Sequence, residues 1–319
     1  MICSKNAFYN RGCFPLTPHQ SRSVRGRLKI ETPAYNHSHR YHNGGPRVRK
    51  ATYFTPRTEV PAQTELITDR SVVTEAYTVI PRGALRDSVV SELPGWNRTA
   101  TWILNRPVAS GATTFSQYLL EVAAGGGSTD PEPEEGVEGF IFILEGRLTL
   151  TLERDEHELE PGGFAFLPAG YPWTAKNIQT EPAKFQWIRK AYQPLAGYEP
   201  APIIGNEREM DASGMPGTDN KWRTTRMIPT DDLAYDMHVN IVTFEAGAVI
   251  PFAETHVMEH GLYVLEGKSV YRLNQDWVEI QEGDYVSLRA FCPQACYAGG
   301  PGNFRYLLYK DMNRHVQLT

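Results

Sequence analysis

Cysteines and long apolar runs are scarce in this chain of 319 residues, and each scarcity excludes a class of protein. Four cysteines are too few for a disulfide scaffold, so a reducing or redox-indifferent compartment is expected. No apolar run approaches the ~18 residues of a membrane-spanning helix, so we expect no membrane partner. With 41% hydrophobic and 22% charged residues, the composition also excludes collagen, coiled coil and disorder throughout.

Basic residues are in the minority over most of the chain, although the net charge of −5 hides their uneven distribution. Residues 1–50 carry ten Lys or Arg and one acid, whereas the remainder carries 22 basic and 36 acidic side chains. The excess of acidic residues after residue 50 disfavours nucleic acid as a partner. Because residues 1–50 lack hydrophobic periodicity, we expect a disordered extension there; an organellar transit peptide is the alternative. A metal site at His37, His39 and His42 is disfavoured, since no rigid element would hold it.

Short β-type runs separated by turn residues follow from about residue 66 onward. Two apolar runs within residues 140–152 are joined by Gly146, which is typical of a β-hairpin. Residues 193–220 are rich in proline, glycine and acids, and we expect them to form a linker. The pattern predicts an all-β protein.

An internal repeat indicates how these strands are organised. One offset of 121 residues separates three pairs of similar phrases, which contain Gly126 and Gly247, Gly146 and Gly267, and Gly162 and Gly283. Chance would not hold one offset over three separated landmarks. The repeat predicts two similar β-domains, residues 51–192 and 221–319, on either side of the linker at 193–220.

The second domain contains a candidate metal site. Glu254, His256 and His260 have the same parity, so their side chains leave one face if the chain is extended between them. A carboxylate and two imidazoles on one face suit a divalent metal. Two other interpretations stay open. One is the helical zinc-protease pattern H-x-x-E-H, which is disfavoured because Pro251 and Gly261 leave room for only a short helix. The other is that the histidines are hydrogen-bonded in a protein core without metal.

These residues resemble the cupin pattern, with Glu254 in place of the first histidine and His260 in place of the glutamate. Counting along the second cupin motif from Gly283 places Gln294 at its histidine position. The resemblance implies a four-ligand set of Glu254, His256, His260 and Gln294, whose oxygen and nitrogen donors suit Mn²⁺. We interpret Cys292 and Cys296, which share the parity of Gln294, as small buried thiols.

The first domain lacks these donors. Subtracting 121 replaces the four predicted ligands by residues that do not match them, namely Pro133, Glu135, Gly139 and Trp173. The same subtraction singles out Tyr271, Tyr306 and Lys310, whose first-domain counterparts are Leu150, Phe185 and Arg189. On one strand, Tyr306 and Lys310 share parity, so both are expected to face the barrel interior near the metal; a surface lysine and two core tyrosines are the alternative.

Over about residues 60–312 the sequence resembles the (S)-ureidoglycine aminohydrolase family of bicupins. The stretches that carry the resemblance are Leu66–Glu75, Phe115–Tyr118, Thr255–Gly267, Val270–Asn274, Arg289–Tyr297 and Arg305–Lys310. The resemblance implies an all-β bicupin fold of two double-stranded β-helix (jelly-roll) barrels. It also implies a manganese-dependent step of purine breakdown, in which water replaces the α-amino group of (S)-ureidoglycine to give (S)-ureidoglycolate and ammonia. Residues 1–50 depart from the resemblance.

The family pattern implies specific roles for the residues of the second domain. Its metal ligands fall on Glu254, His256, His260 and Gln294, and its catalytic residues on Lys310 and Glu254. Substrate contacts are expected at Tyr271, Tyr306, Lys310 and Gln294. The resemblance further suggests a homo-oligomer, which we expect in the cytoplasm unless residues 1–50 direct it elsewhere. A bicupin metal-dependent dioxygenase and a metal-free small-molecule-binding bicupin remain as alternatives.

Overall fold

The computed structural model describes Tyr53 and residues 70–85, 90–107 and 113–315. Within these ranges nearly all regular structure is β-strand, apart from two short 3₁₀ helices, η2 (Arg82–Ala84) and η4 (Glu207–Glu209). No helix in the described ranges is long and apolar enough to cross a membrane. The extension predicted at residues 1–50 lies outside the described residues, and residues 50–319 form one compact unit.

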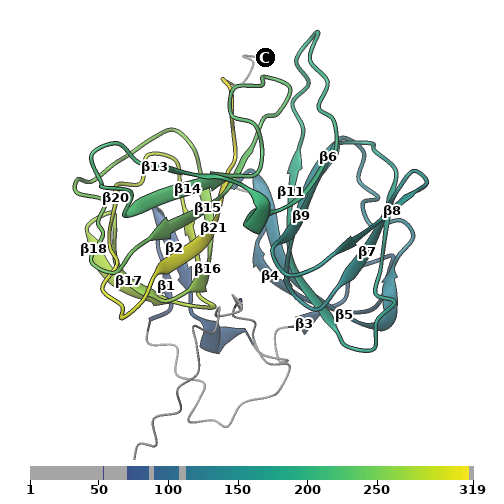
Figure 1. The fold of residues 1–319 in the computed structure, drawn as a ribbon, viewed down its shortest axis with the longest axis horizontal. Coiled ribbons are helices and arrows are strands. Elements are labelled where there is room, and N and C mark those ends of the chain that lie inside the picture. Colours follow the sequence, from purple (N-terminus) through teal and green to yellow (C-terminus); the bar gives the residue numbers. More distant parts are fainter. Residues whose placement is uncertain (1–52, 54–69, 86–89, 108–112, 316–319) are drawn as a thin grey trace, which may run out of the picture. The chain divides into compact units, whose positions relative to one another are not determined.

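The first barrel is built from a ten-stranded antiparallel sheet with the order β12-β9-β6-β11-β5-β10-β7-β8, to which β5 also adds β4 and then β3 (Figure 1). Its strands are β3 (Val90–Ser91), β4 (Trp96–Asn105), β5 (Phe115–Ser128), β6 (Val137–Glu145), β7 (Leu148–Leu152), β8 (Asp155–Leu159), β9 (Gly163–Leu167), β10 (Trp173–Lys176), β11 (Ala183–Ala191) and β12 (Ile203–Asn206).

The second barrel combines an eight-stranded sheet, β1-β2-β19-β16-β21-β15-β14-β13, with a three-stranded sheet, β18-β17-β20. Its strands are β1 (Val72–Val73), β2 (Tyr77–Ile80), β13 (Ala212–Gly214), β14 (Trp222–Arg226), β15 (His238–Phe244), β16 (His260–Glu266), β17 (Lys268–Leu273), β18 (Asp276–Gln281), β19 (Tyr285–Leu288), β20 (Gln294–Tyr297) and β21 (Phe304–Lys310). The chain is therefore an all-β bicupin of two jelly-roll barrels, as the sequence predicted.

Strand pairing reproduces the offset found in the sequence. In the first barrel β6 pairs Gly139 with Arg189, and in the second β16 pairs His260 with Lys310, which is the same pairing shifted by 121 residues. On β5 and β15 the equivalence changes by one residue, because Phe185 pairs with Leu120 whereas Tyr306 pairs with Val242. The phrases at Gly126 and Gly247 therefore match at an offset of 121 in the sequence, but the strands leading into them match at 122.

Gly146 and Gly267 show why the repeat keeps glycine at these turns. Both have a positive φ, of 71° and 75°. A Cβ on Gly146 would lie 2.2 Å from the Pro182 carbonyl oxygen, and one on Gly267 would lie 2.1 Å from that of Asn303. The tight approach of the neighbouring strand end thus excludes any side chain.

Alternation along the strands divides the apolar side chains among three clusters. On β21, Tyr306 and Leu308 belong to the interior of the second barrel, whereas Leu307 and Tyr309 belong to a layer shared with the first barrel. Similarly, Leu120 on β5 faces the first-barrel interior and Leu119 faces the shared layer. Each barrel thus has its own core, and a third apolar layer joins them.

The strand pairing divides the chain differently from the expected boundaries. Strand β2 precedes the whole first barrel in sequence, yet it pairs with β19 of the second, with Ile80 opposite Tyr285. Asp284 fixes this edge by accepting a hydrogen bond from the Arg82 amide at 2.8 Å and by pairing with Arg70. The expected linker at 193–220 contains β12, which pairs with β9 of the first barrel, and β13 of the second. Edge pairing depends on distant residues, so local composition does not indicate it.

Candidate active site

A cavity of about 260 Å³ opens into the second barrel. Its walls carry every site residue predicted from the sequence except Tyr271. The lining residues are Met215, Trp222, Thr224, Arg226, Thr230, His238, Asn240, Val242, Glu254, His256, His260, Gln294, Tyr306, Leu308 and Lys310. The predicted metal ligands, Lys310 and the Tyr306 phenol thus lie around one cavity.

The sheet register explains why side chains from three strands meet here. Lys310 on β21 lies between His238 of β15 and His260 of β16, its paired residues on either side. One interior step further along the strands, Leu308 lies between Asn240 and Leu262. Because alternate residues face the same side of a strand, these two rows form adjacent bands of the cavity wall. The first band is basic and the second is mostly apolar.

Glu254 and His256 reach the cavity from the segment that precedes β16. This segment is not the continuous strand that the parity argument assumed: Glu254 forms an isolated bridge with Gln294, and the chain bends at Val257. The Gln294 Nε2 nevertheless lies 3.1 Å from Glu254 Oε1 and 3.4 Å from His256 Nε2. No helix forms here, so the zinc-protease arrangement, which needs a helix over His256–His260, does not fit.

Burial sets the charge state of the cavity. His260 is 2% exposed, and desolvation, together with the charges of Lys310 and His256, lowers its pKa well below the ordinary value. Desolvation also lowers the pKa of Lys310, although the Glu254 carboxylate opposes this shift. The pKa of Glu254 is raised by burial and lowered again by Lys310. A neutral imidazole and a lysine with a lowered pKa therefore lie in one pocket.

The donor chemistry of the four predicted metal ligands fits a divalent ion. The His256 and His260 ring centroids are 4.4 Å apart, and neither ring nitrogen of His260 has a hydrogen-bond partner among the described residues. A buried imidazole without a partner presents a free lone pair, and the Gln294 amide can present its oxygen after a simple flip. As they stand, no three His, Cys, Asp or Glu side chains in the described part converge into a metal cluster. The fit thus rests on the kind of donor and includes Gln294.

Two phenols support the cavity from within the barrel. Tyr271 lies behind the wall, where its hydroxyl is 3.2 Å from that of Tyr306 and 3.4 Å from Gln294 Oε1. Burial raises the pKa of both tyrosines well above the ordinary value. Both are therefore neutral rather than bases: the Tyr271 hydroxyl donates to Gln294 Oε1, and Tyr306 reaches Gln294 only through Tyr271.

The predicted thiols lie in the barrel wall and do not line the cavity. Cys292 and Cys296 are free and buried. The Cys296 sulfur is 2.9 Å from the Ser269 hydroxyl, and burial raises the pKa of this thiol to about 12. A thiol with so high a pKa is a packing group rather than a nucleophile.

The first barrel has aromatic rings where the second has polar donors. Trp173 stands at the position of Gln294, and its ring centroid lies 6.0 Å from that of Trp187 and 6.4 Å from that of Trp96. Arg189, the counterpart of Lys310, is ion-paired with Glu132 and Glu134. The equivalent barrel interior is therefore filled by packed rings and a satisfied cation.

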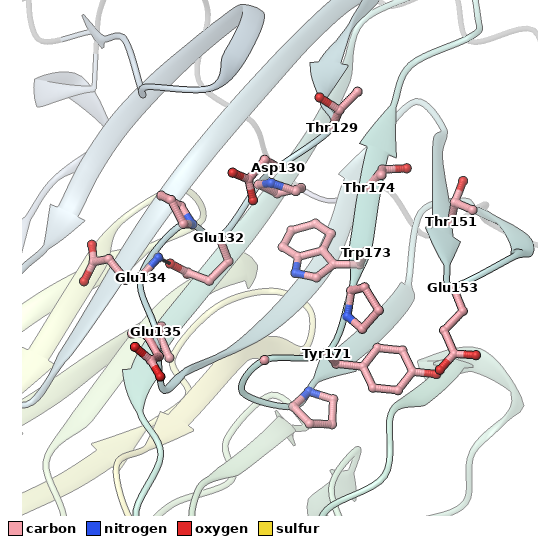
Figure 2. A pocket seen from close by; sticks show the side chains of 16 residues that line it. Thr129, Asp130, Glu132, Glu134, Glu135, Thr151, Glu153, Tyr171, Trp173 and Thr174 are labelled. Carbon is pink, nitrogen blue, oxygen red and sulfur yellow. Dashed lines mark hydrogen bonds between the residues drawn. The ribbon is translucent and has the colours of Figure 1, made fainter.

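A second cavity, of about 370 Å³, lies outside this aromatic plug. Figure 2 shows the Trp173 ring between Tyr171 and the acidic segment that carries Asp130, Glu132 and Glu134. The first-domain counterparts of the predicted ligands thus offer one carboxylate, on Glu135, and one aromatic ring, on Trp173, but no imidazole. This larger cavity lacks the chemistry of the smaller one.

Sequence reasoning missed one wall of the second-barrel cavity. Arg226 and Thr224 come from β14, which follows the expected linker closely, and His238 and Asn240 come from β15. The polar residues at even positions of β15 resemble the parity signal used for Glu254 and His256. The sequence alone does not show that β15 pairs with β21, so this pattern could not be connected with the predicted site residues on β21.

Comparisons with known proteins agree with this architecture. The Cupin domain family matches residues 118–189. The (S)-ureidoglycine aminohydrolase of Escherichia coli (strain K12) is 31% identical over 257 residues, which are 80% of this chain and 95% of that protein. The (S)-ureidoglycine aminohydrolase of Arabidopsis thaliana is 31% identical over 228 residues, 71% of this chain and 74% of that protein. A solved structure from Pseudomonas aeruginosa, described as glyoxylate induced, has a TM-score of 0.79 at 53% identity and covers 85% of this chain and 99% of its own.

Proposed function

The chain belongs to the (S)-ureidoglycine aminohydrolase family, hydrolases that act on a C–N bond, and from this premise we propose that it converts (S)-ureidoglycine and water to (S)-ureidoglycolate and ammonia with the help of Mn²⁺. The observation that carries the proposal is the second-barrel cavity, which gathers a carboxylate, three imidazoles, two amides and a lysine. This set suits a small, charged substrate better than an apolar one.

The proposed manganese ion would be held by Glu254, His256, His260 and Gln294. When bound, it supplies a positive charge that can orient the substrate's carboxylate and amine and stabilise charge at the reacting carbon. Tyr271 contacts Gln294 through its hydroxyl group, and the Tyr306 hydroxyl contacts that of Tyr271. All four ligands come from the second barrel, in agreement with a single site per chain.

Lys310 is the proposed proton carrier. The reaction breaks the bond between the α-carbon and the amine and forms a bond to the oxygen of water. Lys310 gives a proton to the departing nitrogen and regains one from the incoming water, so the protons balance. Burial lowers the pKa of Lys310 and makes this exchange easier near neutral pH.

The test is ammonia release from freshly prepared (S)-ureidoglycine, with the protein first treated with a chelator and then supplied with Mn²⁺. We expect turnover with manganese and little without it. Oxygen uptake in place of ammonia release would indicate the dioxygenase alternative. Ligand binding with no turnover in either condition would favour the metal-free binding alternative.

The assembly and location of the protein remain predictions based on the family. We propose a homo-oligomer in the cytoplasm, with residues 1–50 as the segment that would redirect it. Light scattering of the purified chain and microscopy of full-length and truncated fusions would check these two points. A monomer, or an organellar signal lost on truncation, would contradict them.

A further inference from the structure

Asn240 is a polar residue of the cavity to which the proposed reaction gives no role. It lies on β15, it is 5% exposed, and its side chain lines the cavity. Among the described residues its Oδ1 has no hydrogen-bond partner. A buried acceptor without a protein partner is unfavourable, so its place in the wall calls for a ligand that donates to it.

Two of the other polar side chains on this side of the cavity, His238 and Arg226, already have hydrogen-bond partners. The His238 ring is hydrogen-bonded to Asn313, and Arg226 donates to the Ser213 hydroxyl at 2.6 Å. Arg226 and Lys310 carry positive charge and match a carboxylate rather than a neutral group. Asn240 is the amide of this wall, and its buried oxygen has no partner among the described residues.

The register places Asn240 one interior step away from the reacting end. His260 and Lys310 form the band next to it, and Asn240 lies beside Leu308 in the following band. Interior residues along a strand are about 7 Å apart, because each residue rises about 3.4 Å. A substrate whose carboxylate and amine lie at the first band extends its third substituent over Asn240.

The third substituent of ureidoglycine is a neutral ureido group, with a carbonyl and several N–H groups. An asparagine amide is complementary to it, because its oxygen accepts from an N–H and its nitrogen donates to the carbonyl. Resting on the proposed function, we propose that Asn240 binds the ureido group and sets the specificity of the site for ureido-substituted acids. The first barrel has Tyr118 at the equivalent position, where it packs against Trp187 and fills the space.

The proposal is tested by titrating the manganese-loaded protein with (S)-ureidoglycolate and, separately, with glycolate, which lacks the ureido group. For Asn240→Leu, which keeps the branched shape but removes both polar atoms, we expect ureidoglycolate affinity to fall by roughly 10- to 100-fold. Glycolate affinity should change by less than about 2-fold, because the carboxylate end is intact. Asn240→Ala should show the same contrast if the leucine variant does not fold.

The matched control is Thr243→Val on the same strand. Thr243 does not line the cavity, so both affinities should stay as in the wild type. An unchanged ureidoglycolate affinity in Asn240→Leu, or an equal loss for both ligands, would overturn the role of Asn240. Failure of the proposed function has a different signature, since the wild-type protein would then release no ammonia from ureidoglycine.

Discussion

Thr114 and Asp236 occupy equivalent positions, just before β5 and just before β15, and each binds the other barrel. Thr114 donates from its amide and its hydroxyl to Glu259 Oε2, at 3.0 and 3.1 Å, and from its hydroxyl also to Asp311 Oδ2. Asp236 accepts from Lys190 Nζ at 2.6 Å. The two barrels are thus joined by two related sets of polar contacts, one at Thr114 and one at Asp236, beside the shared apolar layer. We call each set a clasp.

The clasp at Thr114 lies next to the candidate active site. Glu259 and Asp311 precede and follow His260 and Lys310 in sequence, and the Glu259 amide donates to Asp311 Oδ1 at 2.9 Å. The first barrel therefore helps to hold the two strand ends that carry the basic band of the cavity. This gives the barrel without the predicted ligands a part in positioning the site.

Thr114→Val should remove the two hydroxyl hydrogen bonds while keeping the amide bond and the side-chain shape. We expect a loss of about 1–2 kcal/mol in the free energy of unfolding and a fall in kcat of roughly 2- to 10-fold. Urea denaturation and steady-state ammonia release measure the two effects. Thr99→Val, which removes a local hydrogen bond to the Asn97 carbonyl, is the control and should leave kcat unchanged. A normal kcat in Thr114→Val would make the clasp purely structural.

Glu138→Gln should make the stability of the protein less dependent on pH. Burial and the facing Asp236 carboxyl raise the pKa of Glu138 well above its ordinary value of 4.5. The folded state therefore keeps this proton at pH values where the unfolded chain has lost it, so wild-type stability falls as pH rises from about 4.5 through the raised pKa. Glutamine is always neutral and removes that fall.

Urea denaturation at several pH values between 5 and 8 measures the effect of Glu138→Gln. The variant should lose less stability across this range than the wild type, and Glu135→Gln, on the exposed acidic segment, should behave like the wild type. Parallel curves for wild type and Glu138→Gln would show that Glu138 is ionised in the folded protein.

Lys310→Met and Lys310→Arg together separate two roles of the lysine. The methionine keeps much of the side-chain volume, so the barrel should fold normally. Loss of proton transfer should lower kcat by roughly 10²–10⁴-fold in both variants, because arginine cannot release its proton near neutral pH. A normal kcat with a raised KM in the methionine variant would instead show that Lys310 only anchors the carboxylate.

His256→Ala and His260→Ala should abolish manganese retention. Each removes one of the two imidazoles among the four predicted ligands, and the remaining imidazole and two oxygen donors hold the ion far more weakly. Metal analysis after gel filtration, together with the melting-temperature gain on adding Mn²⁺, measures the effect independently of activity. Trp173→Phe in the first barrel is the control and should bind manganese like the wild type. Full occupancy in the histidine variants would refute the predicted ligands.

The sequence was sufficient for the features that depend on repeated phrases and on the alternation of side chains along a strand. The offset of 121 residues predicted the duplicated barrels, and shared parity predicted that Tyr306 and Lys310 face one interior. The bend at Val257 was not predictable, because Glu254 meets Gln294 through a single bridge rather than through a strand. Asn240 was missed for a related reason: the sequence does not show that β15 pairs with β14 and β21, so its neighbours could not be predicted.

The placement of β1 and β2 in the second barrel has a consequence for the order in which the protein is made. The bond from the Arg82 amide to Asp284 joins residues that are 202 positions apart. At about 5–20 residues per second, β2 leaves the ribosome ~10–40 s before the strand it pairs with. During synthesis, the first barrel can close while this edge strand waits unpaired, a state open to association with other chains. The second barrel can be completed only by strands that are translated before the first barrel, so residues 221–319 alone are not an independent folding unit.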